Sequence, residues 1–330
     1  MNVIQIGTGK MGQRWLEALL DSPDVSLVGV VEPVEALRDA AVAKTGLEPG
    51  AAFESIDEAL ASGLQFEAAV IVTPPPTHRA LAEQVLRAGK DVLLEKPLAT
   101  TIEDARALVE IAAETGRTLM VAQNYRYHRS FRELREAIHT GAIGAVTAVT
   151  VRFEKDARTM FGEGDFRYSM EHVLLMDMSI HHFDMIRAAL GANVSRLYAQ
   201  TWHVPEGNFE YDAAATVVMT MDSGASVTYT GNWASFGPET SWNADWEFVG
   251  DEGRIVWTEE GITIQRWGAE PAPLEVAAPL DAQVALVHEF VTAIEAGRQT
   301  ATHADDNIES LAIVFAAIES ATTGEVVSWN

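Results

Sequence analysis

The sequence predicts two domains of different fold class: a doubly wound α/β domain with a parallel sheet (residues 1–122), then an α+β domain with a large, open, mostly antiparallel sheet (residues 123–330). Strand and helix patterns alternate in the first part, which is typical of a parallel sheet covered on both faces. Long strands with alternating polar and apolar residues dominate after residue 145, which favours an antiparallel sheet with one covered face. The length of 330 residues also suits two domains.

The first expected strand, residues 2–6, leads directly into Gly7-Thr8-Gly9-Lys10-Met11-Gly12 and an expected helix. A Gly-x-Gly-x-x-Gly turn in this context is typical of dinucleotide binding, because its glycines allow a tight turn, close approach to a pyrophosphate, and close packing of helix and strand. A second strand, residues 25–31, ends in Glu32, where an acid accepts hydrogen bonds from the adenosine ribose. No Arg or Lys adjoins Glu32 to hold a 2′-phosphate, so we expect NAD rather than NADP.

The alternation continues with expected helices at 35–44, 55–61, 79–88 and 101–115 and expected strands at 68–73, 91–95 and 118–122. Thr77 is a candidate cap for the helix at 79–88. Ligands bind outside the carboxyl ends of parallel strands, so residues there are candidate cofactor contacts: Thr73, Pro74, His78, Glu95, Lys96 and Asn124. Structural roles are the alternative for His78 and Glu95.

In the second part, expected strands lie at 145–154, 194–204, 213–222, 225–234, 244–250 and 253–258, with hairpin turns at 222–224 and 251–253. An apolar helical stretch, residues 174–186, carries Asp177 and His181 four residues apart on one face. Burial of such groups requires pairing or a neighbouring cleft, so the pair is either an acid–base pair or a satisfied core pair. His182 points about 100° away from His181 on a helix, and we expect no metal site.

Composition excludes several classes of protein. Asp and Glu number 48 against 23 Lys and Arg, a formal charge of −25 that repels nucleic-acid phosphates and anionic lipids. The absence of cysteine excludes disulfides and thiolate chemistry. No signal peptide or membrane-spanning run is apparent. We therefore expect a cytoplasmic protein with a small-molecule substrate and no nucleic-acid or membrane partner. Several arginines leave an acidic substrate open as an alternative: Arg126, Arg152, Arg158 and Arg167.

An ordered set of motifs extends across the chain: the Gly-rich turn, Thr73-Pro74-Pro75-x-x-His78, Glu95-Lys96-Pro97, Asn124-Tyr125-Arg126 and Asp177-x-x-x-His181-x-x-Asp184. This set resembles the glucose-fructose oxidoreductase, inositol dehydrogenase and rhizopine-catabolism (Gfo/Idh/MocA) family. The resemblance implies that Lys96, Asp177 and His181 flank the nicotinamide and the substrate, and that copies form a homodimer or homotetramer through the C-terminal sheet. The chain departs from the family pattern at residues 170–173, where many members have a Gly-rich turn, and at Ser179, where Gly is common. Substrate contacts are expected at both departures, which include His172.

These observations predict an NAD-dependent dehydrogenase that acts on a secondary alcohol of a sugar, cyclitol or related polyol. His181 would take the hydroxyl proton, Lys96 would polarise the oxygen, and Asp177 would orient both. The positive charge of an oxidised nicotinamide favours a neutral Lys96, so the roles of Lys96 and His181 could be exchanged. Arg126, Arg167 and His172 are further candidate substrate contacts. A non-catalytic NAD-binding sensor and a reductase of dihydrodiol- or imine-type substrates remain alternatives.

Overall fold

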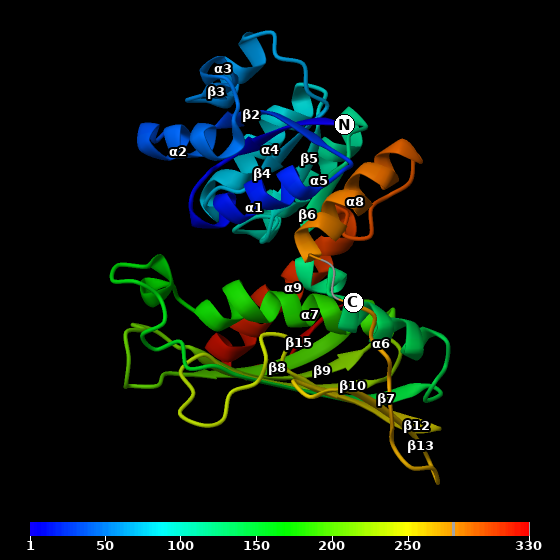
Figure 1. The fold of residues 1–330 in the computed structure, drawn as a ribbon. Coiled ribbons are helices and arrows are strands. Elements are labelled where there is room, and N and C mark those ends of the chain that lie inside the picture. The colour runs from blue at the N-terminus through cyan, green and yellow to red at the C-terminus, as the bar shows by residue number, and fades with distance from the viewer. Residues whose placement is uncertain (279–280, 330) are drawn as a thin grey trace. The chain divides into compact units, whose positions relative to one another are not determined.

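The computed structural model describes residues 1–278 and 281–329 (Figure 1). The chain forms two compact units. Unit 1 comprises Met1–Tyr127 and Leu280–Ile308, and unit 2 comprises His128–Pro279 and Glu309–Asn330. This division differs from the predicted one, which assigned everything after residue 122 to a second domain. The sequence pattern gave no indication that a late segment returns to the first unit.

Unit 1 contains six parallel strands in the order β3-β2-β1-β4-β5-β6, which confirms the predicted doubly wound sheet. The strands are β1 (Asn2–Ile6), β2 (Ser26–Val31), β3 (Ala52–Phe53), β4 (Ala68–Ile71), β5 (Asp91–Glu95) and β6 (Leu119–Ala122). Strand β3 was not predicted, because two residues are too few to show an alternating pattern. Every residue of β4 and of β6 is buried and apolar, as expected of strands with helices on both faces.

The helices of unit 1 follow the strands as predicted: α1 (Lys10–Asp21), α2 (Glu35–Thr45), α3 (Ile56–Ala61), α4 (His78–Arg87) and α5 (Ile102–Thr115). Ser55 and Thr101 cap α3 and α5 by accepting backbone N–H bonds. The prediction that Thr77 caps α4 is wrong. Its hydroxyl bonds the Pro74 carbonyl instead, and the short 3₁₀ turn Pro75–Thr77 leads directly into the helix.

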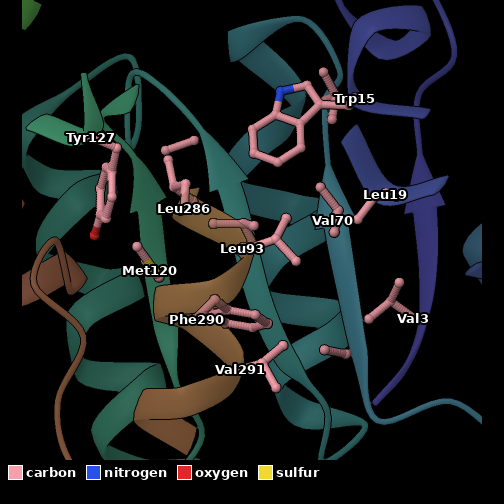
Figure 2. Packing of buried hydrophobic residues seen from close by; sticks show 14 of the residues in the cluster. Val3, Trp15, Leu19, Val70, Leu93, Met120, Tyr127, Leu286, Phe290 and Val291 are labelled. Atoms are coloured by element: carbon pink, nitrogen blue, oxygen red, sulfur yellow. The ribbon is translucent and has the colours of Figure 1, made fainter. Parts of the chain in front are cut away.

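Helix α8 (Ala282–Glu295) explains why the late segment belongs to unit 1. Its apolar side chains join the core cluster of the parallel sheet (Figure 2). Leu286 and Phe290, 0 and 1% exposed, belong to one cluster with Leu93 of β5 and Met120 of β6. Burial of a phenylalanine or leucine side chain stabilises by about 1.5–3 kcal/mol, so these contacts anchor α8 to the sheet.

In the described part of unit 2, nine strands form one sheet in the order β14-β13-β12-β11-β7-β10-β9-β8-β15. Every pairing is antiparallel except β7 with β10, which is parallel; the predicted mostly antiparallel sheet is confirmed. Both predicted hairpin turns join the expected strands. The strands are β7 (Val146–Glu154), β8 (Val194–Trp202), β9 (Ala214–Met221), β10 (Ser226–Asn232), β11 (Asp245–Gly250), β12 (Gly253–Thr258), β13 (Gly261–Arg266), β14 (Ala272–Pro273) and β15 (Val327–Ser328).

Helices cover one face of this sheet (Figure 1). They are α6 (Arg129–His139), α7 (Ile180–Leu190) and α9 (Ala304–Thr323), with a π-helical segment, η5 (Leu174–Ser179), immediately before α7. Short 3₁₀ segments are η3 (Asn124–Tyr127) and η4 (Phe166–Ser169). Among residues 1–278 and 281–329, no helix combines the length and the apolar character needed to cross a bilayer.

Candidate active site

The Gly-rich turn of unit 1 has the predicted geometry. Gly7 has a φ of +93°, and a Cβ there would lie 2.6 Å from the Val72 carbonyl oxygen. A Cβ on Gly12 would lie 2.4 Å from the Gly7 oxygen, so both positions require glycine. Gln5, a residue outside the motif, donates two 2.8 Å bonds from its buried amide to the carbonyls of Gly7 and Gly12. This amide holds the two ends of the turn together.

The residues at this turn fit a dinucleotide. A Cβ on Gly9 would meet nothing within 4 Å, so the missing side chain leaves open space for a close ligand. No side chain caps the start of α1, and Lys10 and Met11 are exposed there. Backbone N–H groups at an uncapped helix N-terminus attract phosphate. The turn would therefore hold the pyrophosphate of NAD with backbone groups and the helix dipole.

Glu32 follows β2 and is 6% exposed. Its carboxylate accepts three bonds, from the Thr8 N–H at 2.8 Å, the Thr8 hydroxyl at 3.2 Å and the Val34 N–H at 3.1 Å. A carboxylate has about four acceptor positions, so capacity remains for ribose hydroxyls. Arg38, which is not adjacent to Glu32 in the sequence but six residues further along, donates to the Glu32 carbonyl at 2.6 Å. A cation thus lies at the strand end assigned to the adenosine ribose.

His78 joins the two loops that follow β4 and β5. Its ring nitrogens lie 2.7 Å from the Pro97 carbonyl and 2.9 Å from the Thr73 carbonyl. The ring is fully buried, and this burial lowers the pKa of His78 although the carbonyl contacts oppose the shift. These contacts indicate that His78 positions the loops; a direct cofactor contact for it remains a prediction.

Glu95 and Lys96 stand at the carboxyl end of β5. The Glu95 carboxylate accepts a 2.8 Å bond from the Trp15 indole and a 2.9 Å bond from the Lys96 N–H. Glu95 therefore fixes the strand end against α1 and shapes the backbone at Lys96, which supports the structural alternative. Lys96 is half-buried in unit 1.

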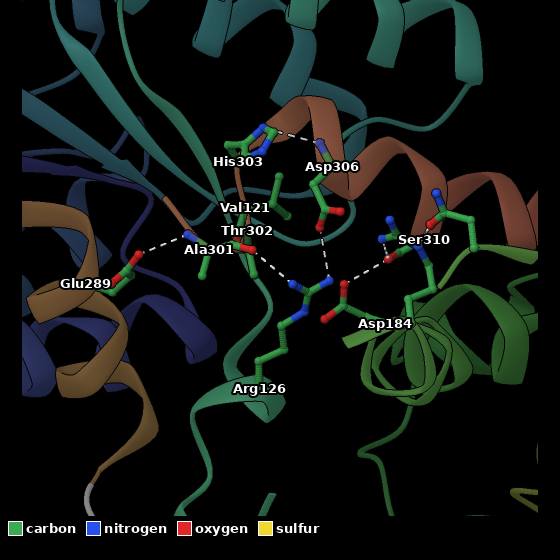
Figure 3. A network of polar contacts seen from close by, with 11 residues as sticks. Val121, Arg126, Asp184, Glu289, Ala301, Thr302, His303, Asp306 and Ser310 are labelled. Carbon is green, nitrogen blue, oxygen red and sulfur yellow. Dashed lines mark hydrogen bonds and ion pairs between the residues drawn. The ribbon is translucent and has the colours of Figure 1, made fainter. Parts of the chain in front are cut away.

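Arg126, a predicted substrate contact, has partners inside unit 1 (Figure 3). Its guanidinium donates to the Ala301 carbonyl at 2.9 Å and to Asp306 at 3.1 Å. Asp306 belongs to the acidic first turn of α9, where a negative charge also suits the helix dipole. These contacts join η3 to the segment before α9 and to the first turn of α9, and Asp306 balances the charge of Arg126 without any substrate.

In unit 2, the segment that carries Asp177 departs from the predicted regular helix. Residues Leu174–Ser179 form a π-helix, whose i→i+5 bonding is frequent at functional sites. His172 precedes it with a φ of +51°. This conformation is the one glycine adopts most easily, so His172 occupies a position where a Gly-rich turn would be unstrained.

Arg167 contacts Asp177, which is another predicted site residue. Its Nε donates a 2.6 Å bond to the Asp177 carboxylate. Its Nη1 lies 3.3 Å from Asp165, which also accepts the Arg167 backbone N–H at 3.0 Å. Burial opposes the charge of Arg167, but Asp177 and Asp165 outweigh it and raise the pKa of the guanidinium. Asp177 therefore has an ionised partner close to it.

The adjacent histidines on α7 have different environments. His182 is fully buried, with its ring nitrogens 3.2 Å from the Tyr229 hydroxyl and 3.3 Å from the Trp242 carbonyl. Ser179 lies 2.8 Å from the same Tyr229 hydroxyl. Ser179 is fully buried; a substrate contact at its position remains a prediction. His182 is a core residue, and His181, 6% exposed, remains the acid–base candidate.

Asp184, the third polar residue of the motif, is 1% exposed and accepts a 2.8 Å bond from Ser310 (Figure 3). Ser310 also lies 2.8 Å from the Arg187 guanidinium. Asp184 thus ties α7 to α9 within unit 2. Within the described ranges, no group of three His, Cys, Asp or Glu side chains could hold a metal ion.

The other arginine candidates are also paired. Arg152 bonds Asp245 at 2.7 Å, and Arg158 bonds Asp156 at 2.8 Å while its guanidinium lies over the Phe236 ring. Beside the Arg167 loop, unit 2 has an open hollow of about 640 Å³, lined by Thr159, Phe161, Glu163, Gly164, Asp165, Tyr168, Ser169, Asn208 and Glu210. Its ionisable lining residues are acidic, so it offers no cation to a substrate carboxylate.

Two family models match the chain. Residues 1–123 match an "Oxidoreductase family, NAD-binding Rossmann fold", and residues 131–256 match the "GFO/IDH/MocA C-terminal domain". Together with the parallel sheet and its Gly-rich turn, these matches define an oxidoreductase with an NAD-binding domain. The chain belongs to the Gfo/Idh/MocA family.

Relatives align over nearly the whole chain. Inositol 2-dehydrogenase of Rhizobium meliloti is 26% identical over 98% of this chain and 97% of its own length. D-Apiose dehydrogenase of Paraburkholderia graminis is 28% identical over 98% of this chain and 88% of its own length. The chain is therefore similar to dehydrogenases of sugars and cyclitols.

Solved structures share the fold. An oxidoreductase from Agrobacterium radiobacter, in complex with NAD⁺, L-tartaric acid and magnesium, has a TM-score of 0.91 at 22% identity, covering 99% of this chain and 98% of that one. An inositol dehydrogenase homolog from Azotobacter vinelandii, complexed with NADH and myo-inositol, has a TM-score of 0.86 at 18% identity, covering 100% and 97%.

Burial of His182 predicts acid sensitivity. Burial lowers the pKa of His182 from 6.5 to about 4, so the unfolded chain binds more protons between these values and stability falls as pH decreases through this window. The loss is on the order of 3 kcal/mol, and the lowered pKa of His78 acts in the same direction. Urea unfolding across this pH range should show a weaker pH dependence for His182→Gln than for the wild-type protein. The exposed His203 supplies a control, His203→Gln; parallel curves for wild type and His182→Gln would contradict the assignment.

Proposed function

We propose that this protein is an NAD-dependent dehydrogenase that moves a hydride between nicotinamide C4 and a secondary alcohol carbon of a neutral sugar, cyclitol or related polyol. The observation that carries the proposal is that a dinucleotide turn and a complete proton-transfer set, Lys96, Asp177 and His181, occur in one chain. A protein that only senses NAD needs no such set. The named relatives, which act on inositol and apiose, support the substrate class.

In the oxidation direction, the imidazole of His181 accepts the hydroxyl proton, because a neutral ring nitrogen is a base near neutral pH. The ammonium group of Lys96 donates a hydrogen bond to the reacting oxygen and stabilises the charge that develops there. Asp177 orients His181 through its carboxylate, which also accepts a 2.6 Å bond from Arg167. Bound NAD supplies the hydride acceptor. In the reduction direction, His181 returns the proton to the oxygen.

Pairing of the arginines supports a neutral substrate. The four candidate arginines each have a carboxylate partner, and the formal charge of the chain is −25. A substrate carboxylate would have to displace one of these partners or enter against the net charge. Carboxylated polyols still belong in the assay, because the Agrobacterium radiobacter relative was solved with L-tartaric acid.

The activity test combines the wild-type protein with NAD⁺ and a panel of neutral polyols, cyclitols and sugar acids, followed by absorbance of reduced nicotinamide. We expect turnover with a neutral member of the panel. Lys96→Met and His181→Asn should each lower kcat by at least about 100-fold, the usual contribution of proton-transfer groups. Their Kd for NAD⁺ should stay within about threefold of wild type, since neither change removes a pyrophosphate or ribose contact.

Three outcomes of this test are informative. Tight NAD⁺ binding without turnover on the full panel would favour the sensor alternative. Near wild-type turnover by both variants would overturn the site assignment. A higher kcat/KM for sugar acids than for neutral polyols would overturn the substrate class alone.

We propose that Glu32 gives the cofactor site a preference for NAD over NADP. Its carboxylate carries a charge that repels a 2′-phosphate, and its remaining acceptor capacity suits ribose hydroxyls. Arg38 is the competing influence, because its guanidinium lies at the same strand end. Fluorescence titration should give a Kd for NAD⁺ at least about tenfold lower than for NADP⁺.

Two variants separate these contributions. Glu32→Gln keeps an acceptor for the Thr8 N–H and should reduce the preference for NAD⁺ over NADP⁺. Arg38→Ala should increase this preference by weakening NADP⁺ binding. Equal affinity of the wild-type protein for both cofactors would contradict the role of Glu32.

We also propose that copies associate through the face of the unit 2 sheet that the helices leave uncovered. Val218 is 44% exposed on β9 and Trp202 is 38% exposed on β8, and exposed apolar side chains on a broad sheet favour an interface. Light scattering should show a dimer or tetramer, and Val218→Asp should weaken the association of the copies. The control Val276→Asp changes an exposed site outside the strands and should leave the association unchanged. A wild-type monomer at micromolar concentration would exclude this interface.

A further inference from the structure

The loop that carries Arg167 is fixed by its own contacts. The Tyr168 hydroxyl donates to the Phe161 carbonyl and accepts from the Phe161 N–H, both at 2.9 Å. Tyr168 is 7% exposed, and its ring meets the rings of Phe161 and Phe209 edge-on. The Glu210 N–H donates to the Tyr168 carbonyl at 2.8 Å. Residues 161–168 therefore form a closed loop that can hold a side chain in one place.

The guanidinium of Arg167 is fixed on several sides. It lies 4.9 Å from the centre of the Phe161 ring and 4.6 Å from that of Phe166, within the range of cation–π attraction. Its Nε contacts Asp177 at 2.6 Å, and Nη1 contacts Asp165 at 3.3 Å. The side chains of Arg167 and Asp177 are 23 and 16% exposed, so solvent screens the pair less than it screens a surface pair.

The Asp177 carboxylate is held by a residue outside its own helical segment. It lies in the π-helical segment Leu174–Ser179, after His172 in the left-handed region. In a π-helix the chain turns through a smaller angle per residue than in an α-helix, so the spacing from Asp177 to His181 does not by itself set their relative orientation. The short bond from Arg167 fixes the carboxylate from the loop side.

We propose that Arg167 is a positioning residue that holds Asp177 in place for proton transfer, and that it does not itself bind the substrate. The role in proton transfer rests on the proposed dehydrogenase function; the contact itself does not. Two carboxylates already balance the guanidinium, so Asp165, Arg167 and Asp177 together carry a net charge of about −1 at neutral pH. This cluster favours neutral hydroxyl groups over a carboxylate in its neighbourhood.

A double-mutant cycle in the full-length protein tests this role. Arg167→Met should lower kcat by about 10- to 100-fold with little change in KM, because it displaces an orienting group and removes no substrate contact. In a protein that already carries Asp177→Asn, the same change should lower kcat by less than about threefold. Arg167→Lys keeps a cation near Asp177 without the planar fork, and its kcat should lie between those of wild type and Arg167→Met.

Arg254 supplies a matched control. Arg254 lies on β12 of unit 2. Like Arg167, it donates a bond to a carboxylate of a neighbouring segment, here Glu247 on β11. Arg254→Met should leave kcat and KM unchanged. If Arg167→Met lowers kcat by the same factor with and without Asp177→Asn, the positioning role is overturned. A rise in KM with unchanged kcat would show a substrate contact instead.

Urea unfolding separates this inference from the proposed function. It compares the wild-type protein, Arg167→Met, Asp177→Asn and the double variant. If the ion pair exists in solution, Arg167→Met should lower the unfolding midpoint more in the wild-type background than in Asp177→Asn. If the midpoint shifts of Arg167→Met and Asp177→Asn add up in the double variant, the Arg167–Asp177 contact is overturned, whatever the activity of the variants. If no polyol is turned over while the midpoints are non-additive, the dehydrogenase proposal and the role in proton transfer fail, and Arg167 still holds Asp177.

Discussion

A charge removed from water must find a partner, and this requirement determines much of the polar architecture of both units. The buried carboxylate of Glu32 accepts two backbone N–H bonds, and that of Glu95 accepts an indole N–H. In unit 2, Arg167 pairs with Asp177 and Ser310 bonds Asp184. Each partner fixes a loop or helix end as well as a charge. The candidate functional groups therefore stand on backbone that a neighbouring polar contact holds in place.

Much of unit 1 could be predicted because its determinants are local. The Gly-rich turn, the strand before it and Glu32 lie within 32 residues, and Gly7 and Gly12 have a steric reason that a spacing pattern can express. Helix α8 could not be assigned in this way. Its apolar face indicates burial, but a local pattern does not say which sheet a helix covers. Only the packing of Leu286 and Phe290 onto β5 and β6 shows it.

The same limit applies to the candidate site. Arg126 and Asp306 are 180 residues apart in sequence, and nothing near either residue announces the pair, so Arg126 was interpreted as a substrate contact. The π-helical segment escaped prediction for another reason. A spacing of four between Asp177 and His181 fits an α-helix, and the apolar pattern of six residues cannot distinguish it from a π-helix. The left-handed backbone of His172 likewise leaves no mark in the sequence.

Adjacent histidines on α7 illustrate how one helix can separate a structural task from a chemical one. Successive side chains on a helix diverge by about 100°, so His182 reaches Tyr229 and Trp242 while His181 points along another direction. Burial keeps His182 neutral above about pH 4, so only one ring nitrogen carries a hydrogen. That nitrogen is Nε2, because it faces the Trp242 carbonyl oxygen, which can only accept a hydrogen bond. Its Nδ1 must then accept from Tyr229, whose oxygen accepts from Ser179. This chain of bonds links the π-helical segment to α7 and β10, so the backbone on either side of His181 is fixed before any substrate binds.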